Sequence, residues 1–204
     1  MIETKREIIL EEGIPVEIFN KDGESLFETT ALIGKATRQF FSEISLESHR
    51  QGQFLPELDI HNGLIVENKV TNDDYIIVAN YPEIIERQKC TIITRMIVCN
   101  SQITVSRLVR TADKFGNIKK DFEDVYKDLS VYAEPIDSEV KQTDPGKLYK
   151  TKYNIYAPNL AIDIEDRLEL EVGGEKKAFK LDGYDSLTFK GLTIIEVTTD
   201  TRRE

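Results

Sequence analysis

Four turn dipeptides divide this sequence and constrain its fold more than any other feature. They are Asp22-Gly23, Asn62-Gly63, Gly173-Gly174 and Asp182-Gly183, and each lies between short runs rich in β-branched and aromatic residues. Such dipeptides tolerate the positive φ angles that a tight β-hairpin requires. The sequence therefore predicts at least four hairpins and an all-β, mostly antiparallel fold of one or two small barrel or sandwich modules.

The individual strands are predicted from the runs between these turns. A short helix is expected in the first dozen residues, where Thr4 is a potential cap and Glu7 follows three positions later, and another around residues 82–87. We expect strands near 14–20, 24–33, 38–47, 63–69, 74–80, 89–99, 102–110, 118–126, 128–134, 149–156, 167–172, 176–182 and 192–199.

Short motifs recur in the same order in the two halves of the chain. Two copies of one β module would explain this order, and chance recurrence of β-branched runs is the alternative. The division is then an arm (1–13), a first module (14–99), a connecting hairpin (100–126) and a second module (127–204). The matched motifs are Val16–Phe19 with Ser130–Tyr132, Pro56–Ile60 with Pro158–Ile162, Ile76–Tyr81 with Phe179–Tyr184, and Thr91–Ile93 with Thr193–Ile195.

The charge of the chain limits its partners. Among 204 residues, 27 Lys and Arg stand against 37 Asp and Glu, which gives a formal net charge of −10. The electrostatic field of this negative charge repels the phosphate backbones of nucleic acids and anionic lipid, so specific nucleic-acid binding is not expected. No apolar run approaches the roughly 18 residues of a membrane span, and residues 1–12 lack the apolar core of a signal peptide. We therefore expect neither membrane insertion nor secretion.

The two cysteines are expected to be free thiols. Cys90 and Cys99 lie on one predicted strand, which at about 3.3 Å per residue separates them by roughly 30 Å. A disulfide needs Cα atoms within about 7 Å, so a reducing compartment, the cytosol, is the simpler inference.

No motif indicates catalysis, a cofactor or a metal ion. His49, expected in an exposed loop at 48–53, and His61 both lack metal-ligand spacing, and phosphate-binding loops and nucleophile elbows are absent from the sequence. The series Asn20, Asp22, Glu24 imitates the start of a calcium loop, but Gly23 occupies its fourth position rather than its sixth. Acidic clusters are better explained as solvated turns, so we predict that the chain is not an enzyme.

One part of the sequence resembles a known family. The run Tyr153–Pro158, then Ile162–Leu168, then a strand ending at Asp182–Tyr184 is similar to head-completion proteins of tailed bacteriophages. These are the stopper or adaptor modules beneath the portal, and the resemblance covers about 50 residues near the C-terminus. Glu165 departs from the family pattern, which commonly has glycine there, and the chain is nearly twice the usual length.

The resemblance implies a structural virion protein, a head–tail connector that forms a homo-oligomeric ring in the neck between portal and tail. It would assemble in the host cytoplasm, contact portal, adaptor and tail proteins, and line a DNA channel without specific nucleic-acid binding. The first dozen residues would form an arm that orders on assembly. Residues 135–147, a polar loop, and 114–121 would make the assembly contacts, with Lys114, Phe115, Asn117, Asp137, Asp144 and Lys147 as the contact residues.

Two other readings stay open. Tail-tube, tail-terminator and distal-tail proteins are also β-rich, oligomeric and free of catalytic motifs. A monomeric carbohydrate- or peptide-binding module belongs to a different class and would present aromatic side chains on one sheet face. Its candidates are Tyr126, Tyr132, Tyr149, Tyr153 and Tyr156, although tyrosines at strand spacing are more often core or interface residues.

Overall fold

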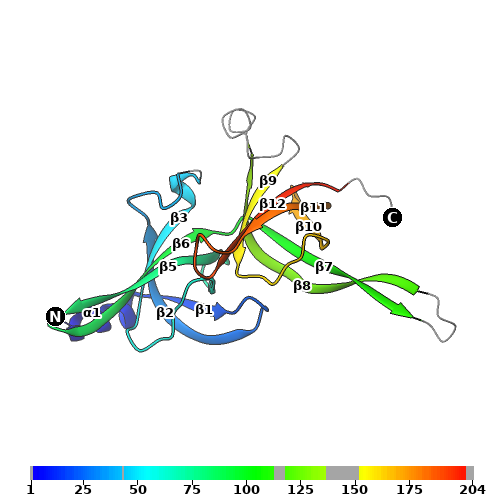
Figure 1. Ribbon diagram of the computed structural model, residues 1–204. Helices are drawn as coiled ribbons and strands as arrows, with labels where there is room; N and C mark the ends of the chain where they lie inside the picture. Colours follow the sequence, from blue (N-terminus) through cyan, green and yellow to red (C-terminus); the bar gives the residue numbers. More distant parts are fainter. Residues whose placement is uncertain (1, 43, 113–117, 137–151, 201–204) are drawn as a thin grey trace. The chain divides into compact units, whose positions relative to one another are not determined.

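The computed structural model describes residues 2–42, 44–112, 118–136 and 152–200. Within these ranges the chain forms twelve β-strands, one α-helix and one short 3-10 helix, and the strands close into two six-stranded barrels (Figure 1). This confirms the all-β, mostly antiparallel fold class predicted from the sequence.

The first barrel contains the first six strands. Around it they follow the order β1-β2-β3-β6-β5-β4, and β4 closes on β1 by an antiparallel ladder that pairs Val16 with Asn68 and Phe19 with Ile65. Closure removes the exposed strand edges that an open sheet would have. The strands are β1 (Ile14–Phe19), β2 (Ser25–Lys35), β3 (His49–Phe54), β4 (Ile65–Asn68), β5 (Asp74–Ile85) and β6 (Gln88–Val98).

The second barrel contains the other six strands in the order β10-β11-β12-β9-β8-β7. It closes between β10 and β7, where Leu168 pairs with Val105 and Leu170 with Ile103. Its strands are β7 (Ser101–Ala112), β8 (Ile118–Pro135), β9 (Tyr153–Pro158), β10 (Arg167–Val172), β11 (Glu175–Asp185) and β12 (Leu192–Thr199).

The two barrels have the same strand order. Renumbering β7 to β12 from one to six turns the second order into 1-2-3-6-5-4, which is that of the first barrel. In both, strand three returns beside strand six, as in a Greek key. The matched motifs 76–81 and 179–184 fall in the equivalent strands β5 and β11, whereas 130–132 lies in β8 and is not equivalent to the β1 motif 16–19.

Residue contacts divide the chain into two units. The first unit comprises residues 1–99 together with the short segments 157–159 and 186–192, and the second comprises the rest. The range 100–126, for which the sequence predicts a connecting hairpin, forms the hairpin β7–β8 and supplies these strands to the second barrel.

Each barrel encloses an apolar core. In the first barrel Val16 and Ile18 of β1 point inward at the period of two that a strand requires. Full burial of such a side chain stabilises the fold by about 1.5 to 3 kcal/mol. The other fully or nearly fully buried members include Phe54, Leu64, Val66, Ile77 and Met96 in the first barrel, and Ile103, Val105, Val131, Ile155, Leu168, Leu170, Ile195 and Val197 in the second.

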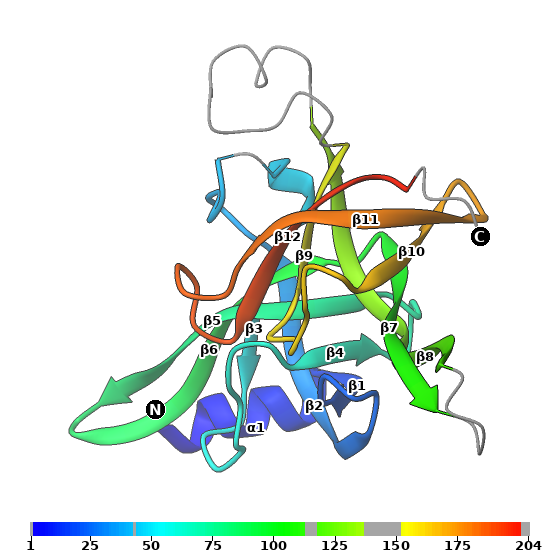
Figure 2. The same cartoon turned by 45° about the vertical axis from the view of Figure 1, so that its right-hand side comes forward.

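The helix α1 (Ile2–Glu12) packs on the first barrel next to β2 and β6 (Figure 2). Its Ile9 side chain is fully buried, and Lys5 Nζ lies 2.6 Å from Glu83 Oε1. The helix ends at Glu12, and the next residue, Gly13, donates its N–H to Ile9 O. A Cβ on Gly13 would come within 2.2 Å of that oxygen. The predicted N-terminal helix is therefore confirmed, and it is docked rather than a free arm.

Two of the four turn dipeptides form hairpins as predicted. Gly23 (φ 77°) connects β1 to β2, and Gly173-Gly174 (φ 63° and 81°) connects β10 to β11. Asn62-Gly63 forms a turn before β4 but does not join two paired strands. Asp182-Gly183 lies inside β11, where the register with β12 shifts in a β-bulge, so this hairpin prediction is wrong.

The strand predicted at 38–47 is also wrong. The described part of this range contains no strand, and the 3-10 helix Leu46–Ser48 precedes β3, whose polar sequence was not predicted to be a strand. Pairing with β2 and β6 on both sides imposes the extended conformation on β3, so tertiary contacts outweigh its local preference. Phe41 and Ile44 are buried in the irregular segment, which explains its apolar composition.

The helix predicted around residues 82–87 is wrong for a similar reason. Residues 82–85 are not helical but extend β5, because they pair with β6 as far as the turn at Glu86 and Arg87 (φ 51° and 68°). The strands predicted at 118–126 and 128–134 form one strand, β8, with a local irregularity where Asp128 has φ 48°.

Candidate functional site

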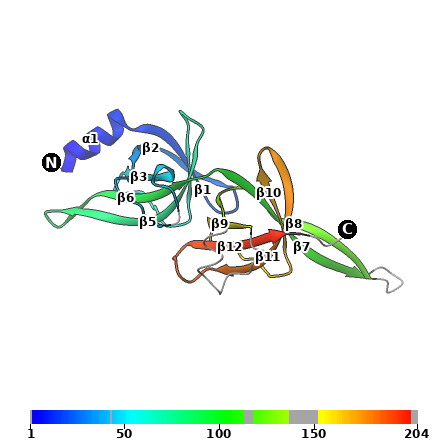
Figure 3. The ribbon, with the colours of Figure 1, turned by 90° about the horizontal axis from the view of Figure 1, so that it is seen from above.

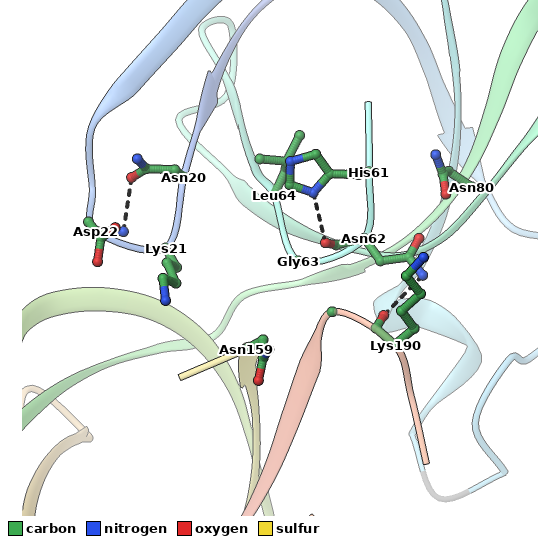
Figure 4. Close-up of a pocket in the computed structure, with 11 residues that line it drawn as sticks. Asn20, Lys21, Asp22, His61, Asn62, Gly63, Leu64, Asn80, Asn159 and Lys190 are labelled. Atoms are coloured by element: carbon green, nitrogen blue, oxygen red, sulfur yellow. Dashed lines mark hydrogen bonds between the residues drawn. The ribbon is translucent and has the colours of Figure 1, made fainter. Parts of the chain in front are cut away.

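A pocket of about 620 Å³ lies in the first unit (Figure 4). Its walls come from the β1–β2 turn, the turn before β4, strand β5 and the segments 157–159 and 186–192. The lining is rich in carboxamide side chains and contains two lysines. The lining residues are Asn20, Lys21, Asp22, His61, Asn62, Gly63, Leu64, Asn80, Asn159, Lys190 and Gly191.

Two glycines bring the backbones of one wall unusually close together. Gly63 and Gly191 both have positive φ, 85° and 84°, and a Cβ on Gly63 would lie 2.2 Å from Gly191 O. Asn62 Nδ2 donates to Lys190 O at 3.0 Å, and Gly63 N–H donates to Ile77 O at 2.8 Å. Only residues without a side chain permit this approach, so the wall is fixed by backbone contacts.

The β1–β2 turn is fixed by Asn20. Its Oδ1 accepts hydrogen bonds from the backbone N–H groups of Asp22 and Glu24, each at 2.9 Å, and its Nδ2 donates to Glu24 Oε2. This Asx-type turn holds Lys21 at the tip, beside the pocket (Figure 4). The series Asn20, Asp22, Glu24 therefore builds a turn, and its likeness to a calcium loop has no structural counterpart.

The pocket is cationic in an acidic chain. Among the described residues neither Lys21 nor Lys190 forms an ion pair, and Asp22 is the one carboxylate in the lining. His61 is exposed, and its Nδ1 lies 3.1 Å from Asn62 O. Nothing local in the sequence indicates that positions 20, 61 and 190 lie around one pocket, so this site was not predicted from the sequence.

A second candidate is the outer part of the β7–β8 hairpin. In Figures 1 and 3 this hairpin extends beyond the second barrel. β10 pairs with β7 only over residues 103–106, and β9 pairs with β8 only over 132–135. The outer part, here named the β7–β8 ribbon, comprises residues 107–112 and 118–125, and its Phe122 and Val125 are 44% and 40% exposed.

The assembly residues predicted from the sequence lie outside the described residues. Lys114, Phe115 and Asn117 fall within 113–117, and Asp137, Asp144 and Lys147 fall within 137–151. These contacts stay predictions.

The structure corrects two expectations about polar and aromatic residues. His49 is not in an exposed loop but is fully buried, with Nδ1 2.9 Å from Ser45 O and Nε2 accepting from Phe41 N–H. Tyr126, Tyr132 and Tyr156 are buried, so they form no aromatic platform on the surface. They belong to the packing of the second barrel.

The described residues contain no cluster of three or more His, Cys, Asp or Glu side chains able to hold a metal ion. Cys90 and Cys99 are free thiols, as predicted. No helix in the described part of the chain is long and apolar enough to cross a membrane.

Comparison with known proteins shows no family. No protein-family model matches the chain, and no curated protein matches it. Protein SF1141 from Shigella flexneri 2a is similar in structure over 52% of this chain and 96% of its own, with 16% identity and a TM-score of 0.44. The K. pneumonia MrkH–c-di-GMP complex matches over 99% of this chain and 86% of its own, with 11% identity and a TM-score of 0.24. At these TM-scores neither likeness carries an inference about function.

Proposed function

We propose that this chain is a non-catalytic assembly protein that forms a homo-oligomer through its β7–β8 ribbon. More specifically, we propose that it is a head–tail connector in the neck of a tailed phage, which is the role that the sequence resemblance implies. The observation that carries the proposal is the ribbon, in which two strands extend past the ladders that close the second barrel.

An isolated two-stranded ribbon is marginally stable in water and offers two unpaired backbone edges. Here it also exposes Phe122 and Val125. Such an edge is a ready site for strand addition, in which main-chain hydrogen bonds give affinity and side-chain pockets give specificity. A protein partner would therefore stabilise the ribbon by completing its backbone hydrogen bonds and covering its apolar side chains.

The partner that we propose is a second copy of the chain. Two copies of the same ribbon can pair edge to edge and cover each other's Phe122 and Val125.

Light scattering after size exclusion, at two protein concentrations, tests the assembly proposal. We expect a species larger than the monomer, and electron microscopy should show rings of one copy number. Phe122→Asp should shift the protein to monomer, whereas Val70→Asp should not, because Val70 is an exposed apolar residue of the first unit. A wild-type protein that is monomeric at both concentrations would contradict the proposal.

The phage role needs its own test. Antibody labelling of purified phage particles should place the protein between head and tail if the connector proposal is correct. Labelling along the tail would instead favour the tail-tube, tail-terminator or distal-tail alternatives, and unlabelled particles would reject a virion role altogether.

A second candidate function is that of a ligand-binding module, and the pocket of the first unit favours it. Small-molecule sites commonly enclose about 300 to 1,000 Å³, and this pocket falls within that range. Most of its lining residues are polar, unlike the aromatic platform expected from the sequence, so we expect charge and hydrogen bonding to contribute to ligand recognition.

A further inference from the structure

We propose that the pocket of the first unit binds a small phosphorylated sugar. The inference rests on the ligand-binding candidate and not on the assembly proposal, and it names both the ligand class and the residues that recognise it.

The anionic part of the ligand is assigned from the two lysines. Lys21 and Lys190 border the pocket from different loops (Figure 4), and neither forms an ion pair within the described chain. Asp22 offsets one of these charges, which leaves the pocket with a net positive charge in a chain of net charge −10. A phosphate group is the kind of anion that such a pair of ammonium groups binds as point charges.

The hydroxyl-bearing part of the ligand is assigned from the hydrogen-bonding side chains that line the pocket. His61 Nδ1 lies 3.1 Å from Asn62 O, and since a carbonyl only accepts, Nδ1 carries a hydrogen and Nε2 is left for a ligand. Asn80 donates its Nδ2 to Ile60 O, which leaves its Oδ1 as a second acceptor. These two atoms can accept the hydrogen bonds that the hydroxyl groups of a sugar donate.

The remaining lining argues for a sugar rather than a nucleobase. Among the described residues that line the pocket, His61 has the one aromatic ring and Leu64 is the one large apolar side chain. A nucleobase is normally held by stacking on aromatic faces, of which this lining offers only the imidazole. The close contact of Gly63 with Gly191 fixes one wall before binding, which lowers the entropic cost of ordering a polar site.

Chemical-shift changes in nitrogen-15-labelled full-length protein would test the assignment, with glucose 6-phosphate as the probe and glucose and inorganic phosphate as separate arms. We expect saturable shifts at the amides of residues 61–64 and 190–191 with glucose 6-phosphate below about 10 mM, and weaker binding of both controls. Inorganic phosphate binding as tightly as glucose 6-phosphate would overturn the sugar assignment. The absence of any shift at these amides would overturn the site.

The lysines are tested by matched variants. The double variant Lys21→Gln, Lys190→Gln should weaken glucose 6-phosphate binding at least about tenfold, since two charge-assisted contacts are lost. Lys89→Gln removes an exposed lysine of the same unit that does not line the pocket, and it should bind like the wild type. If Lys89→Gln weakened glucose 6-phosphate binding as much as the double variant does, the proposal would be overturned. The native mass of both variants should match the wild type, which separates this result from the assembly proposal.

Discussion

Arg107 binds Asp166 through two parallel hydrogen bonds, from Nε to Oδ1 at 3.0 Å and from Nη2 to Oδ2 at 2.8 Å, although Asp166 is only 1% exposed. The hydrogen bond with Asp166 raises the pKa of Arg107 above its ordinary value. Asp166 also accepts from Asp163 N–H, and Arg107 donates to Ala161 O. This pair therefore fastens the connection before β10 to strand β7 of the second barrel.

Replacing Asp166 by Asn should destabilise the protein by about 2 to 4 kcal/mol, because a buried partner of a charged group is lost. We place the value toward the lower end because the Arg107 side chain is 41% exposed. Urea denaturation measures the change. Asp128→Asn breaks the exposed pair with Lys176 and should have little effect, so equal losses in both variants would contradict this account.

His49→Leu should destabilise the first barrel by about 1 to 3 kcal/mol. The change removes the hydrogen bonds of the imidazole with Phe41 N–H and Ser45 O, and losing a hydrogen bond at a buried donor costs about 1 to 3 kcal/mol. Ser45 O keeps the hydrogen bond that Ser48 N–H donates to it. Hydrogen exchange should show faster exchange at amides within 36–48. His61→Leu, an exposed position, should not change the exchange of this segment, and if it does the assignment to His49 is wrong.

The contact between α1 and β5 should weaken in acid. Lys5, with a smaller contribution from Thr91, lowers the pKa of Glu83 below its ordinary value of 4.5. A carboxylate with a lowered pKa in the folded state adds stability at a pH above its unfolded pKa, and this is lost as the pH falls through the folded value. The difference in urea stability between wild type and Glu83→Gln should therefore be fully present well above pH 4.5 and shrink as the pH falls below 4.5. A difference independent of pH would contradict this prediction.

Cys99 should react slowly with iodoacetamide. Desolvation of the half-buried thiol, and secondarily the charge of Asp74, raises the pKa of Cys99 well above its ordinary value, and only the thiolate reacts. Peptide mapping by mass spectrometry, which reports Cys90 and Cys99 separately, should show little alkylation of folded protein at about pH 8 and rapid alkylation in urea. Fast alkylation of folded protein at Cys99 would contradict the raised pKa.

Gly191→Ala should destabilise the first unit more than Gly174→Ala destabilises the second. Both glycines have positive φ, 84° and 81°, so both variants carry a similar backbone strain of about 1 kcal/mol or more. A Cβ on Gly191 would also meet Asn62 O at 2.6 Å, whereas one on Gly174 would meet nothing within 4 Å. Thermal denaturation compares the two, and equal shifts would mean that the close backbone contact contributes little.

The sequence by itself determined the features that depend on neighbours along the chain. Alternating apolar runs specified most strands, Asp22-Gly23 and Gly173-Gly174 specified two hairpins, and α1 was expected in the first dozen residues. The free thiols followed from the placing of both cysteines on one extended segment. In each case a period of two or a turn residue acts within a few positions, so the signal is local.

Tertiary structure decided what depends on long-range pairing. The polar segment 49–54 is a strand because β2 and β6 pair with it, and Asp182-Gly183 is a bulge because β11 continues along β12. The pocket gathers Lys21, His61 and Lys190 from loops that are far apart in the chain. Contacts between residues distant in the chain bring such loops together within the first unit, and they leave no mark on any short stretch of sequence.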